Sequence, residues 1–453
     1  MRDRPETRYV LTEDGVHIGY QVFGEGPVDL IYNDGWMSNV DAGWDIPLQA
    51  DFWRALGRRA RVIMFDRRGF GVSDRPTSPE EMALERGMDD MLAVMDAAGS
   101  ERAIAFGFEA GAAVCLLAAA SYPDRILGLL LQAPLVYYWK TPDFPWGSTE
   151  AFAKEWEERV RTFYGTEDFW RWNFEDMGYA ATDEEVWMWA KWSRLCASPQ
   201  AALAIEQVEQ QVDVRALLPH IQVPTTVVLK AGDLSFDGIW GAAPWVAEQI
   251  PGARYEELPG SAHFSDASDT AFFDVLDRFI SEISNEQAEL DRVLATVLFT
   301  DIVDSTATAA VMGDTKWREV VADHDRLAQG VVGRFRGKFV RGTGDGMLAT
   351  FDGPARAVRC AQAMIEAVKP LGIEVRAGAH TGEITYGGND LAGIGVHVAA
   401  RVAAMGSAGE VWTSSTVKDL TAGSGLTFED AGEHELKGVP DSWRLYRVVN
   451  DGG

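Results

Sequence analysis

The sequence predicts two domains, an α/β domain built on a parallel sheet and a smaller α+β domain. Over residues 28–135 short apolar strands alternate with helices, which is typical of a parallel sheet with helices on both faces. After a polar stretch at residues 284–292 a new apolar strand begins, and the order of elements changes. A length of 453 residues leaves room for two or three domains.

The first domain is expected over residues 1–284, with a helical insertion. From about residue 137 to 207 the chain is helical and rich in tryptophan, and the strand–helix alternation then resumes. One α/β domain interrupted by a helical cap fits this pattern. The expected strands are VDLIYN (28–33), RVIMF (61–65), RAIAFGF (102–108), LGLLLQAP (127–134) and PTTVVLKAGD (224–233), and the closing helix is TAFFDVLDRFISEI (270–283).

The second domain is expected over residues 293–453, after a linker at 285–292. Its elements run strand, helix, hairpin, helix, strand, helix, strand, which is the order of a two-layer α+β sandwich of the ferredoxin-like type. The expected elements are the strand ATVLFTDI (295–302), a helix at 307–335, the hairpin KFVRGTGDGMLATF (338–351), a helix at 355–368, the strand IEVRAGAH (373–380), a helix at 396–405 and the strand EVWTS (410–414).

Composition excludes several classes of protein. The 41 Lys and Arg residues against 69 Asp and Glu give a net charge of -28, which excludes nucleic-acid binding through bulk electrostatics, because that binding needs cations to neutralise phosphates. No apolar run approaches the ~18 residues of a membrane span, and the charged start MRDRPETRYV is unlike a signal peptide. The three cysteines lie far apart, which indicates no disulfide framework. We expect a cytoplasmic protein without a nucleic-acid or membrane partner.

Two aspartates in the second domain indicate a metal and nucleotide site. Asp301 ends an apolar strand just before a helix, and the free N–H groups at a helix N-terminus suit phosphate. Asp345 lies in the glycine-rich hairpin GTGDGM (342–347), where the backbone turns tightly. Either residue alone is explained by a helix cap or a turn. At the ends of two strands of one sheet, they predict a site for Mg²⁺, which takes carboxylate oxygens and substrate phosphates.

The second domain carries five segments in a fixed order: FTDIVDST (299–306), GTGDGMLATF (342–351), AHTGE (379–383), GIGVHVAARV (393–402) and ELKGV (435–439). Over about residues 292–449 it resembles the class III nucleotidyl cyclases. In that family two cyclase domains pair head to tail and each active site lies across the interface, so the resemblance implies a homodimer. It also implies two Mg²⁺ or Mn²⁺ ions per active site and the release of pyrophosphate as a cyclic nucleotide forms.

The resemblance assigns residues to both chains of such a dimer. One chain is expected to bind the metals through Asp301 and Asp345. The partner is expected to supply Arg401, which stabilises charge on the α-phosphate, and Lys437, which contacts the triphosphate. His397 replaces the family's usual ribose-orienting asparagine, and its protonation near neutral pH would make turnover pH-dependent. Further contacts are expected from the backbone of Ile302 to a metal and from Val303, Ser305 and Thr306 to the nucleotide.

The positions that select the base depart from the family pattern. Adenylate cyclases usually use a lysine and an aspartate, and here these positions hold Arg341 and Asp390. Asp390 can accept from the adenine amino group, while Arg341 can donate to adenine N1 or to the paired acceptors of guanine. The two side chains can also pair with each other, which would weaken base selection. We expect ATP as the substrate, with GTP as the alternative.

The first domain carries four segments that are typical of another family: FDRRGFGVSD (65–74), IAFGFEAGAA (104–113), VVLKAGD (227–233) and GSAHF (260–264). Over about residues 9–283 it resembles the α/β-hydrolases with a cap. The pattern Gly-x-nucleophile-x-Gly, which forms the sharp turn of that fold, places Glu109 at the nucleophile position. The same resemblance places Asp233 at the acid position and His263 at the base position.

Glu109 in place of serine predicts a pocket that binds without hydrolysing. A serine esterase forms its acyl-enzyme through a hydroxyl, and Asp34, in YNDGW (32–36), adds negative charge where an oxyanion would develop. A carboxylate-nucleophile hydrolase and an unusual esterase are the alternatives. The tryptophans of the insertion are expected to pack the cap, or to line a ligand pocket with Glu109, His263 and Asp34.

The sequence therefore predicts an adenylate cyclase that works as a homodimer. Its hydrolase-like domain is expected to bind a small molecule, cationic or apolar, and thereby to bias the cyclase. A guanylate cyclase is the nearest alternative. Two further alternatives are a carboxylate-nucleophile hydrolase with a vestigial cyclase domain and a nucleotide-binding sensor without catalysis.

Overall fold

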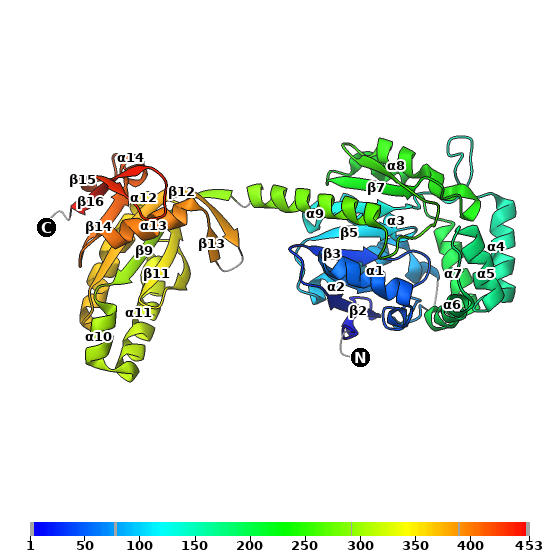
Figure 1. The fold of residues 1–453 in the computed structure, drawn as a ribbon, viewed down its shortest axis with the longest axis horizontal. Coiled ribbons are helices and arrows are strands. Elements are labelled where there is room, and N and C mark those ends of the chain that lie inside the picture. Colours follow the sequence, from blue (N-terminus) through cyan, green and yellow to red (C-terminus); the bar gives the residue numbers. More distant parts are fainter. Residues whose placement is uncertain (1–3, 77–78, 291, 388–389, 450–453) are drawn as a thin grey trace. The chain divides into compact units, whose positions relative to one another are not determined.

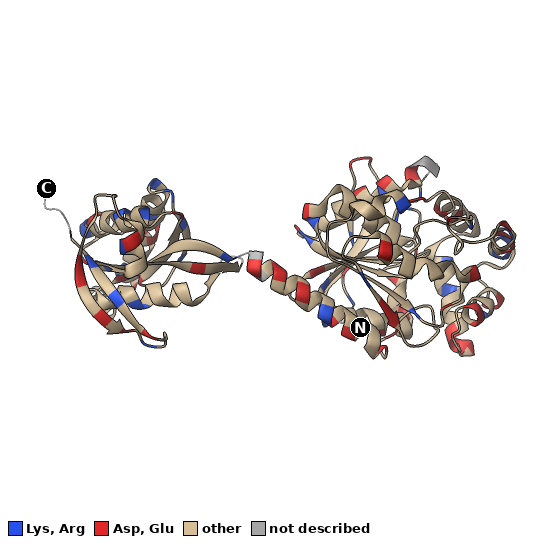
Figure 2. Cartoon of the chain, turned by 90° about the horizontal axis from the view of Figure 1, so that it is seen from above, with Lys and Arg blue, Asp and Glu red and all other residues tan. Residues whose placement is uncertain are grey.

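The protein divides into two compact units. The computed structural model describes residues 4–76, 79–290, 292–387 and 390–449. Unit 1 is Met1–Asn285 and unit 2 is Glu286–Gly453 (Figure 1). Asp and Glu residues occur along the chain in both units (Figure 2). No helix in the described ranges is long and apolar enough to cross a membrane.

Unit 1 is built on an eight-stranded sheet that is parallel except at one edge. The edge strands pair antiparallel, and the remaining neighbours run parallel. The inner parallel strands are buried apolar runs, as expected where helices cover both faces. In spatial order the strands are β1 (Arg8–Leu11), β2 (His17–Phe23), β4 (Arg61–Phe65), β3 (Asp29–Asn33), β5 (Ala103–Phe108), β6 (Ile126–Gln132), β7 (Thr225–Lys230) and β8 (Arg254–Leu258).

Helices form a layer on each face of this sheet. On one face, α2 (Leu84–Ala97), α3 (Gly111–Ser121) and α8 (Ala243–Gln249) share one hydrophobic core with the strands. On the other, α1 (Pro47–Gly57) and α9 (Thr270–Leu290) share a second core. Helix α9 ends at Leu290, beyond the last residue of unit 1, so residues 285–290 of the expected linker are helical, and the next strand begins at Arg292.

The insertion forms a cap of four helices (Figure 1). Each begins after a Ser or Thr whose side-chain oxygen accepts a backbone N–H of the first turn, which is a strong helix-start signal. Buried aromatic side chains hold the helices together; the ring centroids of Trp170 and Trp189 lie 4.8 Å apart. The cap helices are α4 (Glu150–Phe163), α5 (Glu167–Asp176), α6 (Asp183–Cys196) and α7 (Pro199–Glu209).

Unit 2 is built on a second sheet, which is mostly antiparallel. The long strand β9 (Arg292–Ile302) lies inside the sheet and pairs with a neighbouring strand on each side. A short strand lies outside this order and pairs only with β12 (Val375–Gly387). In spatial order the strands are β10 (Lys338–Gly342), β11 (Gly346–Phe351), β9 (Arg292–Ile302), β12 (Val375–Gly387), β14 (Val411–Ser414), β16 (Ser442–Val449) and β15 (Thr427–Glu435), and the short strand is β13 (Asp390–Ala392).

The helices of unit 2 lie on both faces of its sheet. Side chains alternate along a strand, so Leu298 of β9 packs with α11 (Asp314–Arg334) and α12 (Pro354–Val368), while Val297 packs with α13 (Ile394–Met405). The expected two-layer sandwich thus gains a helix on its second face. The single helix expected at 307–335 is two helices, α10 (Ser305–Met312) and α11, which meet at Gly313. A last short helix is α14 (Ser415–Leu420).

Helix α13 lies so close to β12 that a glycine is required between them. A Cβ on Gly378 would lie 2.1 Å from the backbone nitrogen of Ala403. We expect Gly378→Ala to lower the free energy of unfolding of unit 2 by about 1–3 kcal/mol, because the helix would have to move away from the sheet. Calorimetric unfolding measures the change.

Gly330→Ala is the matched control for this prediction. Gly330 is an exposed residue of α11 with no atom within 4 Å of a built Cβ, so alanine there should stabilise by about 0.5–1 kcal/mol. Equal unfolding temperatures for Gly378→Ala and the wild type would contradict the packing.

Candidate functional site

Glu109 lies on the sharp turn between β5 and α3. Its φ of 46° is in the left-handed region, which side chains other than glycine rarely adopt. The turn also needs Gly111, where a Cβ would lie 2.2 Å from the carbonyl oxygen of Asn33. This geometry lifts the Glu109 side chain into a cavity beneath the cap.

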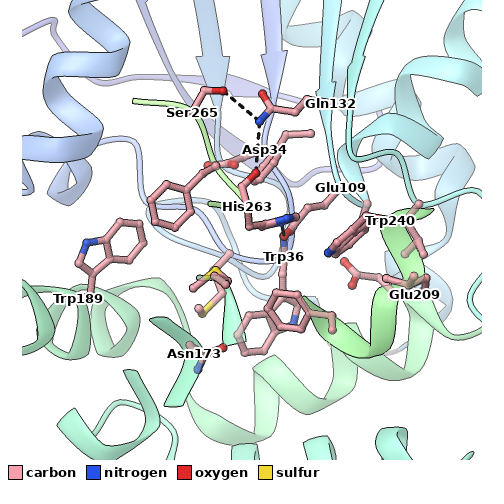
Figure 3. Close-up of a pocket in the computed structure, with 18 of the residues that line it drawn as sticks. Asp34, Trp36, Glu109, Gln132, Asn173, Trp189, Glu209, Trp240, His263 and Ser265 are labelled. Atoms are coloured by element: carbon pink, nitrogen blue, oxygen red, sulfur yellow. Dashed lines mark hydrogen bonds and ion pairs between the residues drawn. The ribbon is translucent and has the colours of Figure 1, made fainter. Parts of the chain in front are cut away.

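Three predicted residues of unit 1 meet in one hydrogen-bonded chain. His263 Nε2 lies 2.6 Å from Glu109 Oε1 (Figure 3). On the other side of the ring, His263 Nδ1 lies 2.7 Å from Asp233 Oδ2. The other oxygen of Asp233 accepts from the Ser235 hydroxyl at 2.6 Å. The histidine is therefore held between two carboxylates, and each of its nitrogens has a fixed partner.

This arrangement keeps His263 protonated. Burial lowers the pKa of His263, but the hydrogen bonds that its ring N–H groups donate to Asp233 and Glu109 outweigh the effect of burial and raise the pKa to about 9. A serine-type hydrolase needs a neutral histidine to take the nucleophile's proton. At neutral pH the histidine of this chain already carries that proton.

Glu109 also accepts a hydrogen bond from a backbone N–H in the position where a hydrolase would stabilise its oxyanion. The N–H of Trp36 donates to Glu109 Oε2 at 3.1 Å. One carboxylate therefore spans the site, with one oxygen on the histidine and the other on this N–H. An oxyanion hole works only when its donors are open to the substrate oxygen. The sequence did not indicate Trp36, because a backbone donor leaves no mark on residue identity.

Asp34 is half-buried beside the hydrogen-bonded residues Glu109 and His263. Its Oδ1 accepts from the Gly35 N–H at 2.9 Å and from the Tyr32 hydroxyl at 3.0 Å. Burial raises the pKa of Asp34 to about 6, with the Glu109 charge adding to the effect. A second acid therefore lines the pocket close to the position where an oxyanion would form.

The cavity of unit 1 has a volume of about 180 Å³ and is lined mainly by aromatic rings. Helix α7 adds two acids that the sequence did not single out, Glu206 and Glu209. Glu209 pairs with Arg67 at 3.0 Å, and burial raises the pKa of Glu209 to about 8. Their spacing of three residues on a helix with apolar neighbours could have indicated a buried acidic pair, since such residues share a face.

In unit 2 the two predicted metal-binding aspartates lie at adjacent positions of neighbouring strands. Asp301 of β9 is opposite Gly346 of β11, so Asp345 is one residue further along. The Ile302 N–H donates to the Asp345 carbonyl at 2.6 Å, and the Ser305 hydroxyl donates to Asp345 Oδ2 at 2.9 Å. Both carboxylates are partly open to solvent.

Arg376 holds Asp301 in an ion pair that the sequence did not predict. The guanidinium lies 2.5 Å from Asp301 Oδ2, opposite it on β12. In the described ranges no three or more His, Cys, Asp and Glu side chains are grouped to hold a metal. The two aspartates are hard oxygen donors and fit Mg²⁺ or Mn²⁺ where substrate phosphates and water supply the other ligands.

The residues expected from a partner chain lie together on another part of unit 2. Arg401 of α13 donates from Nε to the carbonyl oxygen of Lys437 at 3.0 Å. His397 precedes Arg401 by one helical turn, and both are exposed.

Of the two residues expected to select the base, Arg341 is exposed on β10. Asp390 begins β13, and its side chain lies outside the described part of the structure. Three residues are expected to contact the nucleotide at the start of α10. Ser305 and Thr306 are the first two residues of that helix, and Val303 lies two residues before it.

The shared proton of His263 yields a pH prediction. The pKa of His263 is raised from 6.5 to about 9 in the folded chain, so its contribution to stability is complete below about pH 6.5 and is lost as pH rises through about 9. Glu109→Gln removes one of the two carboxylates, so the pKa should fall toward its ordinary value. Histidine ¹⁵N NMR titration measures both values.

Glu155→Gln, on the exposed face of α4, makes the same side-chain change away from His263 and should leave the titration unaltered. A His263 that titrates near pH 6.5 in the wild type would refute the assignment of its proton.

Two curated relatives match different parts of the chain. Candidate adenylate cyclase 3 of Rhizobium meliloti (strain 1021) is 35% identical over 133 residues, which are 27% of this chain and 22% of that protein. Pimeloyl-acyl-carrier-protein methyl ester esterase of Nitrosomonas europaea is 25% identical over 251 residues, which are 55% of this chain and 92% of that protein. The chain thus spans about a fifth of the first relative and most of the second.

A solved structure is similar to part of the chain. The crystal structure of the adenylyl cyclase CyaB from P. aeruginosa has 22% identity and a TM-score of 0.33, over 35% of this chain and 95% of that one.

Family models cover both units. The alpha/beta hydrolase fold family matches residues 30–265. The adenylate and guanylate cyclase catalytic domain matches residues 287–450. The chain therefore belongs to the α/β hydrolase fold family and continues, in unit 2, as a class III nucleotide cyclase domain.

Proposed function

We propose that the chain is an adenylate cyclase that forms 3′,5′-cyclic AMP and pyrophosphate from ATP as a homodimer. The observation that supports it is the strand register that brings Asp301 and Asp345 to adjacent positions of β9 and β11. Two divalent ions bound there would activate the ribose 3′-hydroxyl and neutralise the triphosphate. The matched family includes guanylate cyclases, and GTP is the alternative substrate.

The proposed roles of the chain's own residues follow from their positions. Asp301 and Asp345 hold the ions, and the start of α10 provides N–H groups for phosphate. Arg401 and Lys437 lie together, so a partner chain can present both at once to the α-phosphate and the triphosphate. His397, one turn from Arg401, orients the ribose by donating or accepting a hydrogen bond.

Base selection is assigned to Asp390 and Arg341. Asp390 begins the strand that pairs with the end of β12, and Arg341 lies on β10. An aspartate accepts a hydrogen bond from the amino group of adenine, and guanine has no amino group at that position. This supports ATP over GTP.

Unit 1 is proposed to bind a small molecule that regulates the cyclase. Glu109 binds both His263 and the Trp36 N–H, so the groups that a serine hydrolase uses for proton transfer and for its oxyanion are occupied. The alternative of a carboxylate-nucleophile hydrolase is less favoured, because both carboxylate oxygens of Glu109 are already bound, one by His263 and the other by the Trp36 N–H.

The cyclase proposal is tested with Asp301→Asn. We expect wild-type protein to form cyclic AMP from ATP with Mn²⁺ or Mg²⁺, and to turn over GTP more slowly. Asp301→Asn should lose at least about 100-fold in rate, since a bound ion supplies several kcal/mol of charge stabilisation. Chromatographic separation of the cyclic nucleotide measures the rate.

Asp304→Asn is the matched control. Asp304 lies in the same segment, is exposed and has a φ of 54°, which asparagine adopts readily. It should keep its rate within a few-fold of the wild type, because its exposed carboxylate is not proposed to bind a metal ion. Equal losses in both variants would argue against a metal role for Asp301.

A further inference from the structure

Glu206 is a buried acid of the unit 1 cavity, and burial raises its pKa against the hydrogen bonds that lower it. Its side chain is on α7, only 5% of the residue is exposed, and it lines the cavity. One oxygen, Oε2, accepts from the Trp156 indole N–H at 3.1 Å. The other, Oε1, makes no hydrogen bond of good geometry among the described residues, and the Tyr138 hydroxyl and the Gln210 amide are the polar groups beside Glu206. A buried carboxylate without a counter-ion is costly, so this position favours a cation or a proton.

The charges around the cavity are unbalanced in the same direction. Among the described residues that line it, four are acidic and one, His263, is basic. His263 is already shared between Glu109 and Asp233. The lining acids are Asp34, Glu109, Glu206 and Glu209.

The basic residue nearest to these acids does not restore the balance. Arg67 forms its ion pair with Glu209, and its remaining bonds are to the backbone oxygens of Gly35 and Trp36. In the described structure no ion pair neutralises Asp34 or Glu206. A cationic ligand would supply a positive charge beside these acids, whereas an anionic ligand would lie against the carboxyl groups of Asp34 and Glu206.

The aromatic rings beside Glu206 suit the apolar groups of such a cation. The centroids of Trp36 and Trp156 lie 5.1 Å apart at 61°, and Phe236 contacts Trp156 at 5.4 Å. Ring faces carry partial negative charge and attract ammonium groups. Trp36, Trp240 and Glu209 converge near the Glu109–His263 pair, with Trp189 on the opposite side (Figure 3).

We propose that the cavity of unit 1 binds a small organic ammonium ion, with its charge on Glu206 Oε1 and its alkyl groups against Trp36 and Trp156. The inference rests on the proposed binding role of unit 1 and names the class of its ligand. Trp36 links the site to the catalytic position of the hydrolase fold, because its ring contacts Trp156 and its N–H donates to Glu109.

Calorimetric titration of the full chain with choline and with 3,3-dimethyl-1-butanol tests this inference. The alcohol has the shape of choline without its charge. We expect choline to bind at least about tenfold more tightly, the ratio that one charge-assisted contact supplies. Binding heat is read without any cyclase reaction, so a failed titration and a failed cyclase assay are separate results.

Variants at Glu206 locate the preference. Glu206→Gln should bring the two affinities to within about threefold, while Glu206→Asp keeps the charge and should keep the preference. Glu155→Gln, exposed on α4, should behave as wild type. Alcohol binding as tight as choline in the wild type, no binding of either probe, or an unchanged preference in folded Glu206→Gln would each overturn the proposal. The wild-type comparison needs no variant to fold.

Discussion

The pairing of β9 with its two neighbours is the constraint on which the cyclase site depends. β9 pairs with β11 on one side and with β12 on the other. Because side chains alternate along a strand, a shift by one residue would turn Asp301 to the opposite face and separate it from Asp345. β12 also places Arg376 opposite Asp301, where its guanidinium pairs with the carboxylate. A metal ion that binds Asp301 therefore competes with a cation of the chain itself.

In unit 1 a single side chain changes what the hydrolase fold can do. Glutamate is long enough to reach both His263 and the Trp36 N–H, and it brings a charge that serine lacks. The histidine becomes a charged structural partner of two acids. We propose that the acids of α7 and the tryptophans of the cap form a binding site with a preference for positive charge.

Much of the fold and part of the site could be predicted from sequence. The two units and the strand ends at Asp301 and Asp345 follow from periodicity and from glycine spacing, and the turn at Glu109 follows from the resemblance to the α/β-hydrolases. The Arg376–Asp301 ion pair could not, because it depends on how distant segments pack. The break at Gly313 was missed, although glycine often ends a helix because it adopts a positive φ, here 78°.

The shared active site is the central claim, and mixing two inactive variants tests it most directly. Asp301→Asn and Arg401→Ala are each expected to be inactive alone. In an equal mixture with subunit exchange, half of the dimers combine the two chains, and each of these has one intact site, so about one quarter of the wild-type activity should return. A mixture that exchanges subunits, as shown by tagged chains, and stays inactive would contradict a site built from two copies.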